Sequence, residues 1–115
     1  MSSICHVEYT SSDFANTQNF YEQIFGWSFR TIGDHMMVFG DGDGHIGGFV
    51  KSDTPCSSDT PAIYYKVEDL DGMVVRALAL GATQSRQRHE VPGVGFSASI
   101  ADADGNRIGM VEFTS

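Results

Sequence analysis

Residues 102–112, DADGNRIGMVE, decide the fold of this chain, because an earlier stretch has nearly the same pattern. Residues 43–49, DGHIGGF, also lead from an Asp-Gly turn into an Ile-Gly pair. Asp-Gly favours a tight turn, and the apolar residues after it are typical of a strand. The two stretches therefore predict equivalent strands in two copies of one unit.

The helix signals repeat in the same order. Asp13 precedes an apolar stripe over residues 14–25, and Asp69 precedes a second stripe that starts at Leu70. Aspartate is a preferred helix N-cap, and a stripe of this period favours a helix with one buried face. Gly26 and Gly81 follow the two stripes, where glycine can end a helix in the left-handed conformation. Each half thus contains one predicted helix.

Short apolar or alternating segments predict four strands in each half. They are residues 4–10, 27–32, 35–40 and 45–51, and then 62–67, 83–90, 96–101 and 107–112. We expect an α+β fold of two tandem βαβββ modules that form a curved, mostly antiparallel eight-stranded half-barrel with the helices on its convex face. Module one covers about residues 1–51, a polar linker 52–60, and module two about 61–115, within a single domain of residues 1–115.

Composition excludes several classes of protein. The net charge of −8 disfavours binding to the phosphate backbone of nucleic acids. Apolar runs are too short to predict a membrane span, and the first residues do not resemble a secretion signal, so we expect a cytoplasmic protein. Two cysteines, Cys5 and Cys56, do not make a disulfide scaffold. Cys5 is expected to be a small core residue.

Alternation along the strands sorts the side chains between the two faces of the sheet. In the first strand Cys5, Val7 and Tyr9 are expected to face the helix, which leaves His6 and Glu8 on the concave face. The other residues expected on the concave face are His45, Gly47 and Phe49 (if no bulge intervenes), Ala62, Tyr64 and Lys66, and Gly109 and Val111. The glycines are expected to open room there for an organic molecule.

The order of these motifs resembles the vicinal oxygen chelate superfamily of glyoxalase, bleomycin-resistance and extradiol-dioxygenase type. The motifs are an aspartate and NFYEQIFGWSF within 13–29, HIGGF at 45–49, YYKVEDLDGMVVRALALGA at 64–82 and VPGVGFSASIADADGNRIGMVE at 91–112. The resemblance implies a bowl with up to four metal ligands, which fall here on His6, Gly47, Ala62 and Gly109. Three of these side chains cannot bind a metal, so no cofactor is expected.

The expected function is therefore the binding of a small apolar or aromatic molecule in the cup, as bleomycin-resistance proteins do. The expected ligand-binding residues are His6, Glu8, Gly47, Phe49, Ala62, Tyr64, Phe96 and Gly109. The resemblance also implies a homodimer. The small-molecule ligand and a second copy are the expected partners, with no nucleic acid and no membrane.

Two enzymatic alternatives stay open. One is a lyase, isomerase or dioxygenase of glyoxalase type that uses a divalent Ni, Zn, Fe or Mn ion. A substitute metal site could then come from His6, Glu8 and His45, since two histidines and a carboxylate form a known iron-binding set. The other is a metal-free enzyme in which His6 is the catalytic acid or base. His35 and His89 are expected to be solvated.

Overall fold

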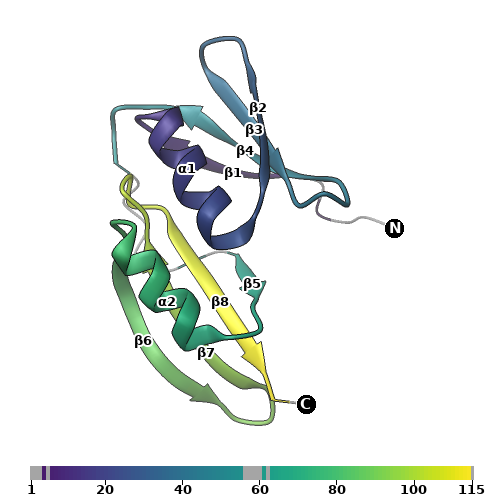
Figure 1. The fold of residues 1–115 in the computed structure, drawn as a ribbon, viewed down its shortest axis with the longest axis vertical. Helices are drawn as coiled ribbons and strands as arrows, with labels where there is room; N and C mark the ends of the chain where they lie inside the picture. The colour runs from purple at the N-terminus through teal and green to yellow at the C-terminus, as the bar shows by residue number, and fades with distance from the viewer. Residues whose placement is uncertain (1–3, 5, 56–60, 62, 115) are drawn as a thin grey trace. The chain divides into compact units, whose positions relative to one another are not determined.

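The computed structural model describes residues 4, 6–55, 61 and 63–114. The chain divides into two compact units, Met1–Pro55 and Cys56–Ser115 (Figure 1). The boundary between them falls within the predicted polar linker 52–60. The predictions for Cys5, Cys56 and Ala62 lie outside the described residues.

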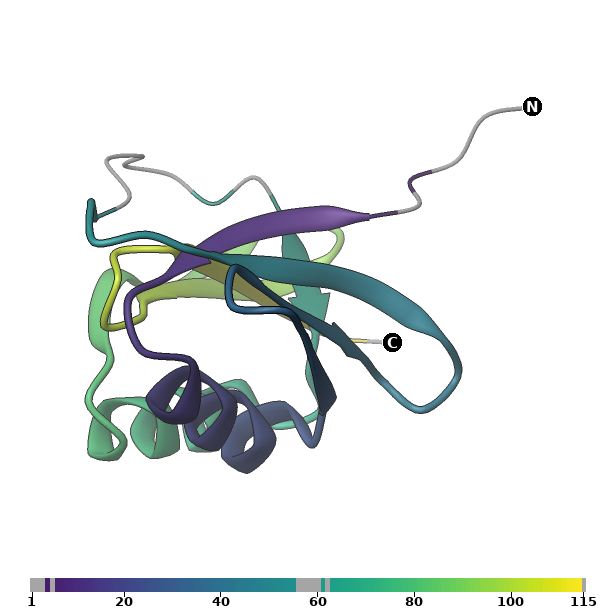
Figure 2. The same ribbon diagram turned by 90° about the horizontal axis from the view of Figure 1, so that it is seen from above.

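The first unit has one helix and one four-stranded sheet. Its elements are β1 (Val7–Ser11), α1 (Phe14–Phe25), β2 (Ser28–Ile32), β3 (Met36–Gly40) and β4 (His45–Lys51). The strand order is β1-β4-β3-β2, and β1 runs parallel to β4 while the other pairs are antiparallel. Helix α1 covers one face of this sheet (Figure 2).

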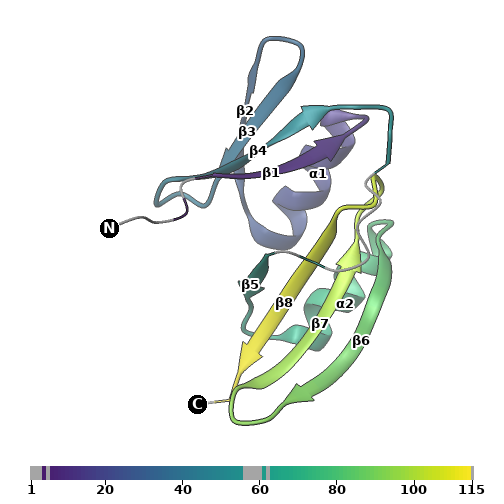
Figure 3. The same cartoon turned by 180° about the vertical axis from the view of Figure 1, so that it is seen from behind.

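The second unit repeats this arrangement. Its elements are β5 (Tyr64–Lys66), α2 (Leu70–Ala79), β6 (Thr83–Val91), β7 (Gly95–Ala101) and β8 (Arg107–Phe113). The strand order is β5-β8-β7-β6, with β5 parallel to β8. Helix α2 contacts β6, β7 and β8 and lies on one face of their sheet (Figure 3). The α+β class and the two βαβββ modules are therefore confirmed.

Both helices begin where their caps were predicted. The Asp13 side chain accepts a hydrogen bond from the Asn16 backbone nitrogen at 3.2 Å, and Asp69 accepts one from Gly72 at 3.1 Å. These bonds satisfy backbone N–H groups that have no partner within the first turn of a helix. Gly26 ends α1 with a φ of 72°, in the left-handed region that glycine adopts at low cost.

Aromatic rings fill the space between α1 and its sheet. Tyr21 of α1 and Phe49 of β4 are fully buried, and their ring centroids lie 5.2 Å apart. Trp27 stacks on Phe39 of β3 at 4.4 Å. Burying an aromatic side chain of this size contributes about 1.5–3 kcal/mol, so this cluster is a main source of stability in the first unit.

A β-bulge changes which side chains of β4 face the helix. Phe39 pairs with Gly47, but the next residue of β3, Gly40, pairs with His45, so Ile46 is an extra residue. A shift of one residue moves a side chain to the other face of the sheet. The prediction that Gly47 and Phe49 lie on the concave face with His45 is therefore wrong, since Phe49 packs on Tyr21 of α1.

The faces of β5 and β8 are as predicted. Met110 is fully buried in the core of the second unit, while its neighbours Gly109 and Val111 lie on the opposite face of the sheet. Tyr64 pairs with Gly109 and Lys66 with Val111, so these side chains share that face. We use the term helix-free face for the side of each sheet that is opposite to its own helix.

Candidate functional site

The helix-free face of the first unit carries a cluster of His6, Glu8 and His45. The His6 Nδ1 and His45 Nε2 atoms lie 2.8 Å apart, and the two rings are stacked with centroids 5.0 Å apart. The Glu8 Oε1 atom lies 3.5 Å from the other His6 nitrogen, Nε2. The bulge in β4 explains the contact, because it turns His45 to the face where His6 lies.

The partners of His6 determine where its proton belongs. A carboxylate can only accept, so the Glu8 carboxylate favours the neutral tautomer of His6 that carries its proton on Nε2. The Nδ1 atom of His6 is then an acceptor for the Nε2–H group of His45. The His6–His45 contact is thus a hydrogen bond, and Glu8 adds an ion-pair contact to the other nitrogen of His6.

This cluster does not have the geometry of a metal site. Ligands of one ion must direct their lone pairs at one point, but Glu8 and His45 lie at opposite nitrogens of the His6 ring. No group of three or more His, Cys, Asp or Glu side chains within the described ranges could hold a metal ion. The structure brings His6, Glu8 and His45 together, but not with the geometry that the alternative of a substitute metal site requires.

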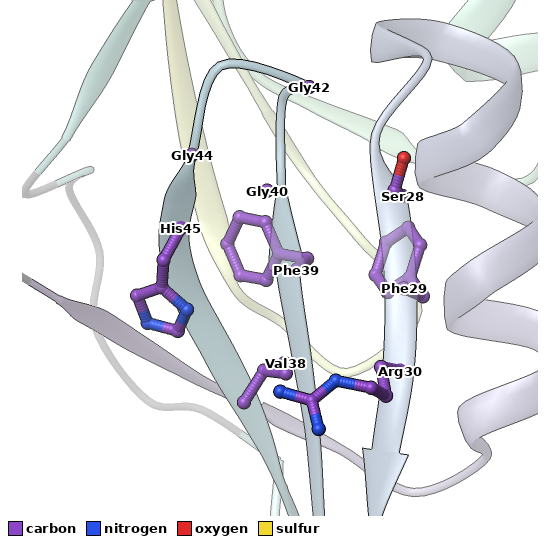
Figure 4. A pocket seen from close by; sticks show the side chains of 9 residues that line it. All are labelled: Ser28, Phe29, Arg30, Val38, Phe39, Gly40, Gly42, Gly44 and His45. Carbon is purple, nitrogen blue, oxygen red and sulfur yellow. The ribbon is translucent and has the colours of Figure 1, made fainter.

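A pocket of about 280 Å³ adjoins His45 in the first unit. Figure 4 shows Arg30 of β2 and His45 of β4 at this pocket, with Val38 of the intervening strand β3 between them. The other lining residues are Ser28, Phe29, Phe39, Gly40, Gly42 and Gly44. Arg30 supplies a permanent positive charge to a pocket that is otherwise mostly apolar or built from glycine.

A second pocket, of about 300 Å³, lies within the second unit. We call it the valine pocket, because three of its residues are valines. Its lining residues are Tyr64 of β5, His89 and Val91 of β6, Val94 of the β6–β7 turn, Ser97 of β7 and Val111 of β8. Each of the four strands of the sheet contributes to it.

The polar side chains of the valine pocket are each held by a neighbour or half exposed. The Ser97 hydroxyl donates to the Met110 carbonyl oxygen at 3.1 Å. The His89 Nδ1 atom lies 3.1 Å from the Gln87 carbonyl oxygen, which can only accept. The Tyr64 side chain is 51% exposed. The pocket therefore combines aliphatic walls with a few fixed polar atoms.

The glycines of the two matching strands do not leave empty space. A β-carbon on Gly109 would stand 2.7 Å from the Tyr64 Cγ atom, so the tyrosine ring fills that position. A β-carbon on Gly48 would stand 2.8 Å from the Met36 Sδ atom and 3.4 Å from the His6 Cε1 atom. The expectation that Gly47 and Gly109 open room for a bound molecule is therefore wrong, since a β-carbon on Gly47 would likewise stand 2.8 Å from the Val7 Cγ2 atom.

The predicted match between Gly47 of the first unit and Gly109 of the second is also wrong by one residue. Gly109 pairs with Tyr64 and Ser99, just as Gly48 pairs with Glu8 and Val38. The counterpart of Gly109 is thus Gly48 and not Gly47. The one-residue difference comes from the bulge in β4.

Phe96 was expected to touch the ligand, but it lies on the same side of its sheet as α2. It pairs with Glu112, whose carboxylate accepts a hydrogen bond from the Leu70 nitrogen at the start of α2. The Arg88 guanidinium lies 4.0 Å from the centre of the Phe96 ring, and its Nε atom is 3.7 Å from Asp71 of α2. Phe96 therefore does not line the valine pocket on the helix-free face.

Some pocket residues were not expected from the sequence. His89 was expected to be solvated, but it is half-buried and lines the valine pocket. His89 pairs with Ser97, so the two residues lie on one face of the sheet. The alternation of Ser97 and Ser99 with Ala98 in the sequence was the available signal for which residues of β7 share that face. The sequence offered no signal that Arg30 lines a pocket. That pocket also needs His45, whose position depends on the bulge in β4.

The family comparison covers nearly the whole chain. Residues 3–110 match the model of the Glyoxalase/Bleomycin resistance protein/Dioxygenase superfamily. A curated relative, "Putative glyoxylase CFP32" of Mycobacterium tuberculosis, is 27% identical over 90 residues, which are 75% of this chain and 34% of the relative. The chain thus spans about a third of the length of the curated relatives that it matches.

Solved structures show the same fold at low sequence identity. The fosfomycin resistance protein FosX of Listeria monocytogenes, in a monoclinic crystal form, has a TM-score of 0.81 at 20% identity, covering 99% of this chain and 93% of that one. A glyoxalase/bleomycin resistance protein/dioxygenase family enzyme of Burkholderia phytofirmans PsJN has a TM-score of 0.76 at 20% identity, covering 95% of this chain and 97% of that one.

Neither helix in the described part of this chain is long and apolar enough to cross a bilayer.

Proposed function

Starting from the fact that the chain belongs to the glyoxalase/bleomycin resistance protein/dioxygenase superfamily, we propose that it binds a small apolar or aromatic molecule without a resident metal ion. The observation that carries this proposal is the valine pocket. Ligand sites are concave and mostly apolar, with a few polar groups that fix the orientation of the ligand. The valine pocket has this composition within one unit.

The size of the valine pocket limits the ligand. At about 300 Å³ it is at the lower end of the range for small-molecule sites. A bicyclic aromatic compound is therefore a suitable probe. Its flat ring would contact the valine side chains and the exposed edge of Tyr64, since an aromatic residue with a polar tip suits a flat ligand.

The family's metal does not fit the residues of this chain. Of the four positions that correspond to family ligands, only His6 has a donor side chain. Gly47 lies on the face toward α1, and the place of a side chain at Gly109 is filled by Tyr64. A transition metal needs at least three nitrogen, oxygen or sulfur ligands, which this set does not supply. Elemental analysis of protein purified without chelator tests this point directly.

The binding proposal is tested with naphthalene and 2-naphthol, followed by two-dimensional NMR of the backbone amides. We expect both to shift signals of β5–β8. Val111→Phe fills the pocket and should abolish the shifts, whereas Val75→Phe, on an exposed position of α2, should not. Absence of shifts in the unmodified protein, or equal shifts in Val111→Phe, would contradict the proposal.

A second candidate function is favoured by the cluster of His6, Glu8 and His45. A histidine oriented by a carboxylate is an arrangement suited to a catalytic acid or base. The pocket with Arg30 adjoins this cluster, and the cation could hold an anionic substrate. Under this second candidate, the chain would have an enzymatic activity of the kind that the name of the curated relatives, "Putative glyoxylase CFP32", indicates.

Turnover assays with His6→Ala distinguish the second candidate from the first. If the protein is an enzyme, His6→Ala should lower kcat by about 10²–10⁴-fold, and His35→Ala, at an exposed position outside the cluster, should not. Binding of 2-naphthol in the second unit should persist in both variants. Loss of binding with His6→Ala would count against assigning the ligand to the valine pocket.

Homodimerisation stays a proposal that rests on the family resemblance, and a cytoplasmic location stays a proposal that rests on the sequence. Light scattering on the purified full chain measures its mass in solution. We expect twice the mass of 12.5 kDa.

A further inference from the structure

We infer that the valine pocket selects aromatic ligands that carry an O–H or N–H donor, such as a phenol. This inference rests on the proposed binding function and adds the chemical class of the ligand. Its basis is that Ser97 and His89 both offer acceptors to the pocket. A molecule that can only accept hydrogen bonds would leave these atoms unpaired.

Ser97 is an acceptor because its proton is already used. Its hydroxyl donates to the Met110 carbonyl oxygen at 3.1 Å, and the residue is only 4% exposed. A hydroxyl has one proton and two lone pairs, so the oxygen has acceptor capacity left but no donor. Turning the proton toward a ligand would leave the buried carbonyl of Met110 without this bond, at a free-energy cost.

His89 is an acceptor for a similar reason. Its Nδ1 atom lies 3.1 Å from the Gln87 carbonyl oxygen, so Nδ1 must carry the proton that makes this bond. In neutral histidine the other nitrogen, Nε2, then has a free lone pair. The structure shows no protein partner for Nε2 among the described residues.

The sheet register places the two acceptors side by side. His89 pairs with Ser97, and Ser97 pairs with Val111, so the three residues form a row across β6, β7 and β8. Neighbouring strands are about 4.8 Å apart, so the row is about 10 Å long. A bicyclic ring placed over Val111 can bring a hydroxyl on its far edge to Ser97 and His89.

Tyr64 does not change this selection. Its hydroxyl can donate or accept, and its side chain is half exposed, so it can adapt to either kind of ligand. The specificity therefore comes from the two acceptors whose protons are fixed by backbone carbonyl groups.

The test compares three ligands of the same ring: 2-naphthol, 2-methoxynaphthalene, which has lost the donor, and naphthalene. Dissociation constants are measured by NMR titration of the full chain. We expect 2-naphthol to bind at least about tenfold more tightly than 2-methoxynaphthalene, because the ether leaves both acceptors unpaired. In His89→Phe and in Ser97→Ala this ratio should fall toward one, while His35→Ala should keep it.

The outcomes separate this inference from the proposed function. If 2-methoxynaphthalene binds as tightly as 2-naphthol, or if neither Ser97→Ala nor His89→Phe changes the ratio, the inference is wrong and the binding function stands. If none of the three ligands binds, the proposed function itself fails. Ser97→Ala is the smaller change and keeps the test informative if His89→Phe does not fold.

Discussion

The ring of Tyr64 on β5 occupies the space in which Gly109 on β8 would carry a side chain. The two residues are partners in the parallel pair of strands, and a β-carbon on Gly109 would stand 2.7 Å from the Tyr64 Cγ atom. In the first unit Met36 and His6 fill the corresponding space at Gly48. Glycine therefore recurs at this place in both units because a neighbouring side chain packs against the strand.

This relationship predicts a specific coupling between Tyr64 and Gly109. Gly109→Ala should lower the free energy of unfolding by about 1–3 kcal/mol, because the new methyl group overlaps the ring. In a Tyr64→Ala background the same change should cost less than about 0.5 kcal/mol. Urea denaturation of the four proteins measures the coupling as a double-mutant cycle. An equal loss in both backgrounds would show that the ring is not the cause.

Replacing the aspartate in the turn before β8 should lower the free energy of unfolding more than replacing its counterpart in the turn before β4. Asp102 accepts hydrogen bonds from the Asp104 and Asn106 nitrogens at 3.0 and 2.9 Å and from the buried Asn106 side chain at 2.9 Å. Asp41 accepts one bond, from the exposed Asp43 nitrogen at 2.9 Å. Asp102→Ala should cost about 2–3 kcal/mol and Asp41→Ala about 0.5 kcal/mol, because buried groups that lose their partner cost most. Thermal or urea unfolding checks the order, and a larger loss at Asp41 would contradict it.

Helix caps give matched predictions in the two units. Asp13→Ala and Asp69→Ala should each cost about 1 kcal/mol, because each removes the acceptor for a backbone nitrogen in the first turn. Asp71→Ala is the control, since its side chain is exposed and its contact with Arg88 is long at 3.7 Å. That change should cost less than about 0.5 kcal/mol. If Asp71→Ala lowers the free energy of unfolding as much as Asp69→Ala does, the loss at Asp69 does not come from its role as helix cap.

The cluster in the first unit predicts the tautomer of its histidines. Neutral His6 should carry its proton on Nε2, toward Glu8, and its Nδ1 atom should accept from His45. Long-range ¹⁵N–¹H spectra of the imidazole rings distinguish the two tautomers. Glu8→Ala should weaken this preference, because the acceptor that fixes the proton is removed. A wild-type His6 with its proton on Nδ1 would refute this assignment of the tautomer.

Much of the fold could be predicted because its signals are local. Asp13, Asp69 and Gly26 mark helix ends by the chemistry of their own residue type. Strand alternation also gave the correct faces for Tyr64 and Gly109, where no register shift occurs in the pairing with β8. The repeat of these signals was sufficient to predict two βαβββ modules.

The errors at the site have a physical cause in strand register. The bulge at Ile46 turns Gly47 and Phe49 away from His45, and a turn of glycine and aspartate does not show it in advance. Register shifts in β6, on either side of Arg86, likewise hid the inward position of His89. Pocket residues thus depended on pairing between strands, which a single sequence does not specify.

Ligand binding by the second unit without a metal ion is tested most directly by a calorimetric titration of chelator-treated protein with 2-naphthol. Elemental analysis first shows that this protein is metal-free. We expect a Kd of about 100 μM, from about 0.5 kcal/mol for each non-hydrogen atom of the ligand, and no change when Ni²⁺, Zn²⁺ or Mn²⁺ is added. Binding that appears only after a metal ion is added would contradict the claim.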